Sequence, residues 1–306
     1  MNFITRVIIY LFLIVSPAKS EEVYKLNFSR FFKIELENNE KKKFIKNLAK
    51  AYIHEEDGNS IYIKQQYKKW FNGKLTLKEK NIIKKYKIKL RLHGDHKSHI
   101  QMAKNRMSLK IKIIDDTING VRVFRLFLPE TRNGTNEIYA NLLFSKIGFP
   151  TFYTKMVNVS FLNQEYKAIF QETGSKEFLE RNGLSEVPII KVGELPKHIN
   201  RKFVRKKLVP VTYINNSSGI LKKKNSITTI NEAIYLMNSK NFKNMIFQNK
   251  LFEETLKEMS NVEYVHGLIV YNRKFIYLPV NRIFIPLYYD GNVGIKKELK
   301  CNYKIQ

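Results

Sequence analysis

Three kinds of side chain in this 306-residue chain have the chemistry to hold a phosphorylated ligand together with a metal ion. Lys110 and Lys112 are two residues apart in an alternating stretch, so both lie on one face of a predicted strand. Glu137 follows in the first turn of a predicted helix. Near the end of the chain, Asn272 and Asp290 offer amide and carboxylate oxygens, the hard ligands that Mg²⁺ prefers. Together these residues indicate phosphate chemistry.

The elements that must position these residues form a continuous series in the middle of the chain. Strict alternation of apolar and basic residues predicts the first two strands, and Gly148 with Pro150 predicts the end of the helix that carries Glu137. In chain order we predict strands at 86–93 and 108–113, a helix of about eleven residues that ends near Lys146, strands at 154–161 and 166–170 joined by a polar turn, and a capped helix at 175–182.

The flanking regions are predicted to be more helical. The segment 21–85 carries helical periodicity at 41–54 and 75–85, with a strand or two beside it. A basic, irregular stretch follows between about 194 and 226. The remaining predicted elements are two helices within 228–259, broken near Lys240, and two strand-like runs at 274–278 and 282–289.

This order of elements is typical of the small lobe of a protein kinase, in which a lysine on a strand and a glutamate on a helix grip the ATP phosphates. We therefore predict an α+β, atypical protein-kinase-like two-lobed fold: a small lobe with an antiparallel sheet plus a helix, and a mainly helical second lobe. The predicted divisions are a signal peptide at 1–20, an extension at 21–85, the small lobe at 86–193, and a basic linker with the helical lobe at 194–306.

Several short motifs resemble the CotH kinase family of atypical, often secreted kinases. They occur in the family's order, although Gln164 stands where the family usually has a glycine after the hairpin asparagine. The resemblance covers roughly 85–193 and resumes from about 266 to 292. The motifs are Arg-Leu-His-Gly-Asp at 91–95, Arg-Met-Ser-Leu-Lys-Ile-Lys at 106–112, Leu-Pro-Glu-Thr-Arg at 128–132, Asn-Val-Ser-Phe-Leu-Asn at 158–163 and Lys-Glu-Phe-Leu-Glu-Arg-Asn at 176–182.

The resemblance implies roles for particular residues. Lys110, rather than its neighbour Lys112, would bind phosphate and pair with Glu137, although a solvent-facing basic strand explains the two lysines equally well. Asp95 would close a glycine turn over the nucleotide or simply form a tight turn, and Glu172, at the hinge-like position, would position backbone.

The end of the chain supplies the metal ligands but departs from the kinase pattern. Asn272 and Asp290 have the placement of the residues that hold Mg²⁺ or Mn²⁺. A kinase has an aspartate five residues before that asparagine, and here Gly267 occupies the position. The adjacent His266 is a candidate base because histidine titrates near neutrality, although a lone histidine is more often structural.

The first twenty residues and the overall charge indicate an exported protein with anionic partners. A basic residue, a short apolar core and a small-residue cleavage site predict a secretory signal peptide at 1–20. The formal net charge is +28, which favours nucleotides, anionic glycans or acidic surfaces over neutral partners and is also typical of a lysine-rich composition. The single cysteine, Cys301, excludes an internal disulfide and a cysteine-based metal site.

We therefore predict an exported kinase-like protein, located in the cell envelope or secreted, that binds ATP with Mg²⁺ or Mn²⁺ and phosphorylates a surface protein or an anionic glycan. The alternative is a non-catalytic surface or envelope protein that uses its basic face for adhesion or assembly. Gly267 favours the alternative, whereas Glu137, Asn272 and Asp290 favour the enzyme. Nucleic-acid binding rests on charge alone and ranks last. No membrane span is expected once the signal peptide is removed.

Overall fold

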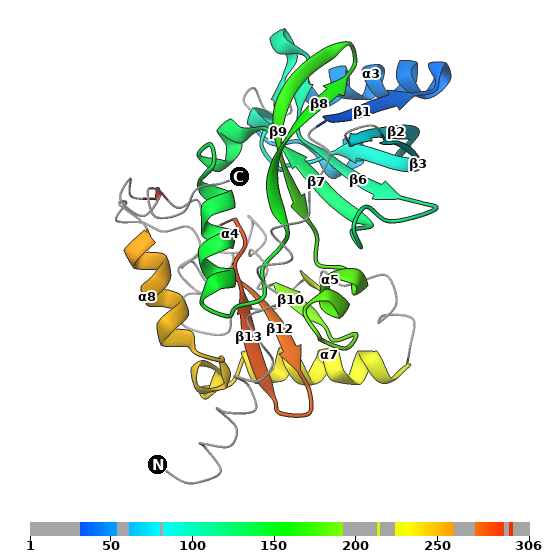
Figure 1. Ribbon diagram of the computed structural model, residues 1–306. Helices are drawn as coiled ribbons and strands as arrows, with labels where there is room; N and C mark the ends of the chain where they lie inside the picture. The colour runs from blue at the N-terminus through cyan, green and yellow to red at the C-terminus, as the bar shows by residue number, and fades with distance from the viewer. Residues whose placement is uncertain are drawn as a thin grey trace.

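A closed barrel and a smaller sheet with helices around it make up the described structure (Figure 1). The computed structural model describes residues 31–53, 61–79, 82–191, 213–214, 224–259, 273–290 and 294–295. Predictions that fall on other residues, including the signal peptide, His266, Asn272 and Cys301, lie outside this range.

Seven strands form the barrel, in the order β1-β2-β3-β6-β7-β9-β8. Neighbouring strands are antiparallel except at the closure, where β1 pairs in parallel with β8 through residues 31–33 and 158–160. The strands are β1 (Phe31–Leu36), β2 (Phe71–Glu79), β3 (Ile82–Leu92), β6 (Leu109–Ile113), β7 (Val123–Phe127), β8 (Thr154–Phe161) and β9 (Gln164–Glu172).

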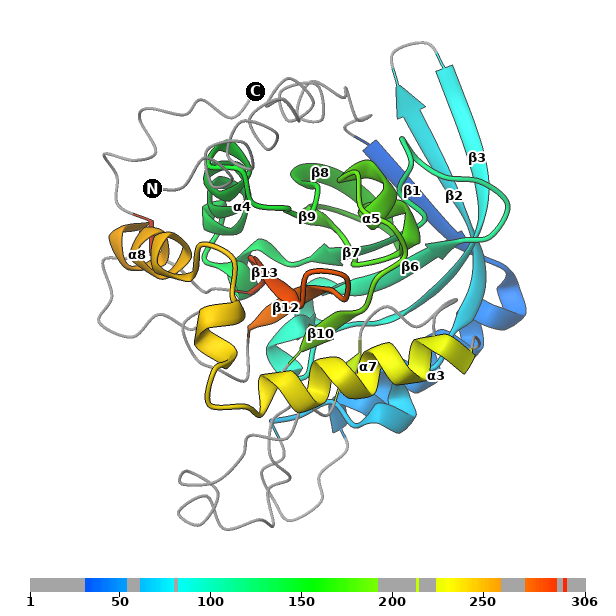
Figure 2. The ribbon, with the colours of Figure 1, turned by 90° about the horizontal axis from the view of Figure 1, so that it is seen from below.

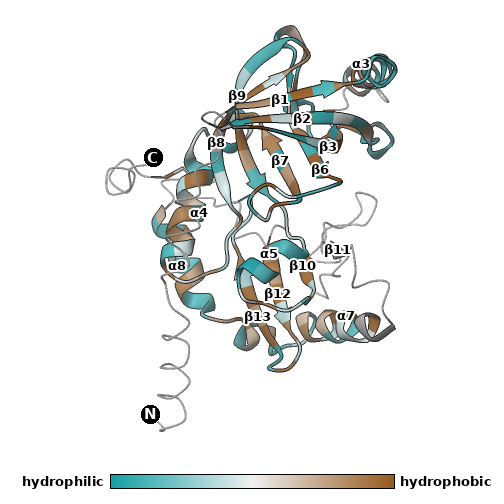
Figure 3. Ribbon diagram, turned by 45° about the vertical axis from the view of Figure 1, so that its right-hand side comes forward, coloured by the Kyte–Doolittle hydropathy of each residue, from teal (hydrophilic) through white to brown (hydrophobic). Residues whose placement is uncertain are grey.

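Alternation along the strands decides which side chains fill the barrel. Apolar residues at every second position, such as Ile88 and Leu90 of β3 and Ile111 of β6, point inward into one continuous core. Their neighbours point outward, so the strands change between brown and teal in Figure 3. Helix α3 (Asn38–Ile53) adds Phe44 to this core, where its ring packs edge-on against Phe71.

A second, four-stranded sheet lies below the barrel, in the order β11-β10-β12-β13. Its strands are β10 (Ile189–Lys191), β11 (Tyr213–Ile214), β12 (Lys274–Leu278) and β13 (Ile283–Leu287). The helices outside the barrel are α4 (Asn136–Lys146), α5 (Lys176–Arg181), α7 (Lys224–Met237) and α8 (Asn249–Met259). Short elements are β4 (Ile100–Gln101), β5 (Arg106–Met107) and the 3₁₀ turns at 65–67, 97–99, 102–104, 129–132 and 242–245.

Helix α4 joins the two parts through an aromatic cluster. Phe144 on α4 stacks on Tyr288, which directly follows β13, at 5.2 Å between ring centroids, and also contacts Phe252 of α8 at 4.6 Å. Each such aromatic pair stabilises the fold by about 0.5–1.5 kcal/mol beyond the contribution of its buried surface area. The first turn of α4 is thereby held close to the end of β13.

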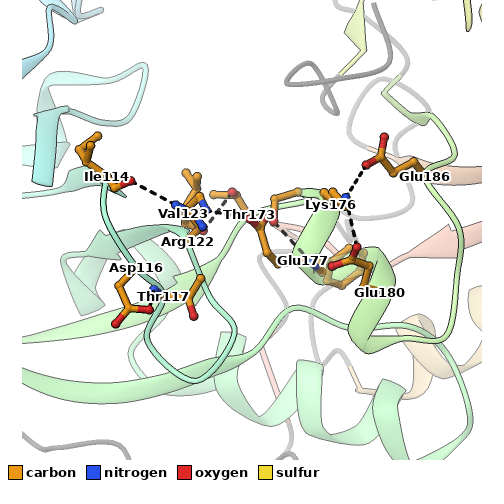
Figure 4. Close-up of polar contacts among 12 residues, drawn as sticks. Ile114, Asp116, Thr117, Arg122, Val123, Thr173, Lys176, Glu177, Glu180 and Glu186 are labelled. Carbon is orange, nitrogen blue, oxygen red and sulfur yellow. Dashed lines mark hydrogen bonds and ion pairs between the residues drawn. The ribbon is translucent and has the colours of Figure 1, made fainter. Parts of the chain in front are cut away.

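The connection from β9 to α5 forms the other link, and Figure 4 shows its polar contacts. The guanidinium of Arg122, in the turn between β6 and β7, donates to Glu177 of α5 at 2.9 Å and to the Ile114 carbonyl at 3.3 Å. Thr173 donates through its hydroxyl to the Val123 carbonyl at 3.1 Å. These contacts tie the beginning of β7 to α5.

The predicted two-lobed kinase-like fold with a mainly helical second lobe is wrong. Among the described residues there are seven barrel strands and only five α-helices, and the lower part is itself built on a sheet. The predicted extension at 21–85 contributes β1 and β2 to the same barrel as the predicted small lobe. The helix predicted at 75–85 is wrong as well, because this stretch forms the β2–β3 hairpin, in which cross-strand pairing overrides local periodicity.

Most elements between residues 86 and 182 agree with their predictions. The structure confirms the strands that became β3, β6, β8 and β9, and the helix α4. It also confirms the capped helix, since the Ser175 hydroxyl accepts from the Phe178 amide at the start of α5. The helices within 228–259 are likewise separated near Lys240.

Candidate anion-binding site

A row of polar residues crosses the outer face of the barrel. Arg91 on β3 lies directly opposite Lys110 on β6, Lys110 lies opposite Arg125 on β7, and Arg125 lies opposite Gln171 on β9. Directly opposed residues in antiparallel strands point to the same side, with Cβ atoms about 4.5–5.5 Å apart. Three cations are therefore adjacent on this face, with no acidic residue in the row.

Arg125 is the most unusual member of the row because it is buried and forms no salt bridge with any described residue. Arg125 is 4% exposed, and its Nε and Nη1 atoms have no hydrogen-bond partner among the described residues. The guanidinium lies 5.3 Å from the ring centroid of Tyr289, a cation–π contact. Buried donors normally have a hydrogen-bond partner. Burial of an unpaired charge costs on the order of several kcal/mol of folding free energy. The guanidinium therefore keeps donors that the described residues do not satisfy.

Lys110 shares this environment. Burial, together with the positive charges of Arg125, Arg91 and Lys112, lowers the pKa of its ammonium group from 10.5 to about 7. No described carboxylate forms a salt bridge with it. The prediction that Lys110 lies opposite the apolar positions of its strand is confirmed, and Lys112 on the same face is exposed. Lys110 is thus the more enclosed of the two lysines.

The β12–β13 hairpin supplies the other side of the site. Lys274, at the start of β12, is 2% exposed, and its Nζ lies 3.1 Å from the ring centroid of Tyr289. The same ring therefore contacts Arg125 from the barrel and Lys274 from the lower sheet. This arrangement places the cations of two different sheets around one aromatic side chain.

Glu137 is buried nearby but does not pair with Lys110. Its carboxylate accepts hydrogen bonds from Gln171 Nε2 at 2.7 Å and from the Tyr288 hydroxyl at 3.1 Å. Burial raises its pKa, against the opposing effect of Arg132. The salt bridges among the described residues do not include the predicted pair with Lys110. Glu137 instead positions Gln171, the last residue of the polar row.

Asp290 lies at the edge of the same cluster. Its carboxylate forms an ion pair with Arg132 at 3.3 Å, and its side chain is 27% exposed. Its backbone φ of 49° is in the left-handed region, which is uncommon outside glycine and Asn and is often found at functional sites. The guanidinium of Arg132 rests on the ring of Phe127, 4.0 Å from the centroid.

A loop between β3 and β6 covers this end of the barrel. His99 is buried and its Nδ1 lies 2.9 Å from the Ser108 hydroxyl, which also accepts from the Leu128 amide. Burial lowers the pKa of His99 to about 4, and burial with the nearby arginines lowers the pKa of His93 well below its usual range. Gly94 has a φ of 99°, and a Cβ there would lie 2.1 Å from the His99 ring. Two neutral histidines therefore line the loop.

The two other predicted nucleotide-binding residues are not part of the cluster. The Asp95 side chain is 85% exposed and forms a salt bridge with Lys68 at 2.5 Å. Glu172 is fully buried, where its carboxylate accepts from Arg181 of α5 and from the Tyr153 amide. Burial raises its pKa to about 7 although Arg181 opposes this shift. Glu172 thus holds the barrel to α5, in line with the structural role expected for it.

The sequence prediction missed Arg125, Gln171, Lys274 and Tyr289. A signal for Arg125 was present, since it is a lone charge within the apolar stretch Val-Phe-Arg-Leu-Phe-Leu at 123–128. Such a stretch is typical of a strand buried on both faces, where a charge calls for an explanation. The other three residues carry no such signal, because their role depends on contacts between separate sheets.

Of the two residues predicted to bind a metal ion, only Asp290 lies among the described residues. Asp290 is present in the cluster, whereas Asn272 and the candidate base His266 lie outside the described residues. Within the described ranges, no group of three His, Cys, Asp or Glu side chains is arranged to hold a metal ion. Mg²⁺ often binds through one or two carboxylates with phosphate and water as the other ligands, so Asp290 fits a metal that arrives with a phosphorylated ligand.

Comparison with known proteins adds no relative. No protein-family model matches the chain, and no curated protein matches it either. Among the residues that the structure describes, no helix has both the length and the apolar character needed to cross a membrane.

Proposed function

We propose that this protein binds the phosphates of ATP at Lys110 and Arg125 and transfers a phosphoryl group to a surface protein or glycan. The observation that carries this proposal is the pair of adjacent, largely buried cations without an acidic partner among the described residues. An anion that bound there would satisfy the free donors of Arg125 and would favour the charged form of Lys110.

A polyphosphate suits the site better than a single carboxylate. Arg91 stands beside Lys110, so three positive charges are aligned across adjacent strands over roughly 10 Å, as the spacing of about 4.8 Å between strands implies. A planar guanidinium and a compact ammonium bind phosphate in complementary ways, one through a fork of donors and the other as a point charge. A chain of phosphates spans such a row.

Asp290 would hold a divalent metal ion that accompanies the nucleotide. Its carboxylate is partly exposed and forms an ion pair with Arg132. A bound Mg²⁺ supplies neutralisation of the phosphate oxygens. The role of Arg132 is then to orient the Asp290 carboxylate while its own guanidinium packs on Phe127.

Thermal unfolding with and without ATP, in the presence and absence of Mg²⁺ or Mn²⁺, tests the proposal. ATP at about 100 times its dissociation constant should stabilise the native protein by roughly 2.7 kcal/mol. Lys110→Met should remove most of this stabilisation, and Asp290→Asn should remove its metal-dependent part. Lys112→Met, an exposed position on the same strand, is the matched control and should respond like the parent. An unchanged ATP response in Lys110→Met would rule out the site.

The titration of Lys110 predicts a pH dependence of ATP binding. In the free protein its pKa is lowered to about 7, so the charged form becomes scarce at higher pH. Because the anion binds the charged form, affinity should fall by up to tenfold per pH unit between about pH 7.5 and 9. Lys110→Arg keeps its charge throughout this range and should bind ATP with little pH dependence, as isothermal titration would show. An equal pH dependence in both proteins would contradict the assignment to Lys110.

Transfer of γ-phosphate from radiolabelled ATP to envelope proteins or glycans separates this function from its alternative. ATP binding with no transfer to any such acceptor would leave a non-catalytic, nucleotide-binding surface protein. Absence of both binding and transfer would leave the adhesive or structural role predicted from the basic surface.

A further inference from the structure

A second cationic feature continues from the anion-binding site along the outside of the barrel. Three lysines and one arginine occupy four successive outward positions of β3, at every second residue from 85 to 91, and further lysines face the same way on the strands beside it. We call this surface the basic face; it consists of Lys74, Lys85, Lys87, Lys89, Arg91, Lys110 and Lys112. It lies on β2, β3 and β6, and the β2–β3 arm projects away from the rest of the molecule in Figure 2.

The basic face opposes like charges directly across its strands. Lys74 is paired in register with Lys87, and Lys89 is paired with Lys112. Directly opposed like charges destabilise a sheet, whereas directly opposed opposite charges stabilise it. Among the described residues, none of these four lysines forms a salt bridge, and all four are exposed. The arrangement is therefore unfavourable in the isolated protein and becomes favourable when an anion covers it.

The spacing of the charges indicates the shape of that anion. Residues at alternate positions of a strand lie about 6.6–6.8 Å apart, so the charges on β3 form a straight row with this period. An extended polypeptide repeats its side chains on one face with the same period. A segment with acidic residues at alternate positions therefore matches the row charge for charge.

The composition of the face argues for a polypeptide over a nucleic acid. Proteins that bind single-stranded nucleic acid combine basic grooves with aromatic side chains on which the bases stack. The described outward residues of β2, β3 and β6 on this face include no aromatic side chain. Trp70 stands just before β2, at one end of the row, where Arg91 stacks on its ring at 4.9 Å.

We propose that the basic face docks an extended acidic segment of a partner polypeptide and directs it toward the anion-binding site. The last cross-strand pair of the face, Arg91 with Lys110, is also the beginning of the polar row that contains Arg125. A segment bound along β3 thus ends beside Lys110. The direction of the segment rests on the proposed function, whereas its binding to the face does not.

Binding of poly-L-glutamate to the full-length protein tests the docking surface. Replacement of Lys85, Lys87 and Lys89 by glutamine should weaken this binding by about tenfold or more, since exposed ion pairs contribute up to about 1 kcal/mol each. The matched control replaces Lys42, Lys46 and Lys50, three exposed lysines on α3, by glutamine with the same change in net charge. Equal losses in the two triple variants would show attraction by net charge alone and would overturn the proposal.

Two further comparisons identify the partner class. A peptide that alternates Glu with Ser should bind more tightly than a peptide of the same composition with its glutamates in one block. Heparin or single-stranded DNA that bound the face more tightly than both peptides would overturn the choice of a polypeptide.

The nucleotide response distinguishes this proposal from the proposed function. The face variant should keep the stabilisation by ATP, whereas Arg125→Met should lose it and still bind poly-L-glutamate. Failure of ATP binding alone would leave the docking surface in place, and failure of polyglutamate binding alone would leave the nucleotide site.

Discussion

Arg125→Met is expected to stabilise the ligand-free protein and at the same time to abolish its response to ATP. Arg125 is 4% exposed, and two nitrogens of its guanidinium have no hydrogen-bond partner among the described residues. Methionine fills a similar volume without a charge, so it removes a desolvation cost that the native protein bears. We expect a gain of about 1–2 kcal/mol, because loss of the cation–π contact with Tyr289 offsets part of the benefit.

The prediction is specific because the variant should gain stability without ATP and should lose the stabilisation that ATP gives the parent protein. ATP at about 100 times its dissociation constant stabilises the parent protein by roughly 2.7 kcal/mol, and the variant should show no stabilisation at the same concentration. Thermal unfolding of both proteins with and without ATP measures the two effects together. A merely structural arginine would behave differently, since its replacement would destabilise the protein in both conditions.

Arg106→Met provides the matched control. Arg106 is partly buried. Unlike Arg125, it forms an ion pair with Glu130 at 3.0 Å and donates hydrogen bonds to the Gln101 side chain. Its replacement should lower stability by about 1 kcal/mol and leave the ATP response intact. If Arg125→Met instead destabilises the free protein as Arg106→Met does, the guanidinium is already satisfied and the assignment of an anion site fails.

Arg181→Met is expected to destabilise the protein by roughly 3 kcal/mol at pH 8, with a smaller loss at lower pH. Arg181 is the cationic partner of Glu172, which is fully buried at the junction of β9 and α5. Without the arginine, Glu172 at pH 8 must either stay ionised as a buried charge, with the Tyr153 amide as its donor among the described residues, or take up a proton; both cost stability. Breaking such a pair from one side costs more than removing both partners.

The sign of the pH effect follows from the direction of the Glu172 shift. Burial raises the pKa of Glu172 to about 7 in the folded protein, above the 4.5 of an exposed glutamate. Between these two values the folded state binds more protons than the unfolded state, so stability falls as the pH rises through this window. Loss of Arg181 raises the pKa of Glu172 in the folded protein further, because Arg181 lowers it in the parent. The decrease in stability with rising pH therefore continues to a higher pH in the variant.

Urea unfolding from pH 5 to pH 8 measures this dependence. The double variant Glu172→Gln/Arg181→Met should recover part of the lost stability and should lack the added pH dependence, because glutamine does not titrate. A loss in Arg181→Met that is the same at pH 5 and pH 8 would show that packing on Phe178, rather than charge, explains the effect.

Elements with strong local signals could be predicted from the sequence. The alternation from Tyr86 to Leu92 is so regular that the strand and its inward face follow from it, and Ser175 marks the start of α5. Helix α4 has clear stop residues at its end. The short strand β7 was not predicted, because its apolar stretch lacks alternation, and Arg125 was missed with it.

The strands of the first part of the chain were also mispredicted, for a different reason. The β2–β3 arm is rich in lysine, which is compatible with a helix as well as with an exposed strand. Its structure depends on β1 and on the pairing of β1 with β8, more than a hundred residues away in the sequence. No local pattern reports such a pairing.

The sequence by itself determined which residues of each predicted strand face the same way, and hence that Lys110, Lys112 and the lysines of β3 lie outside. Only the tertiary structure decided that the barrel closes, that Glu137 bonds to Gln171 and Tyr288 in place of Lys110, and that Arg125 is buried against Tyr289. The physical reason is that side-chain direction along a strand follows from local backbone geometry, whereas burial and charge pairing depend on which distant elements pack together.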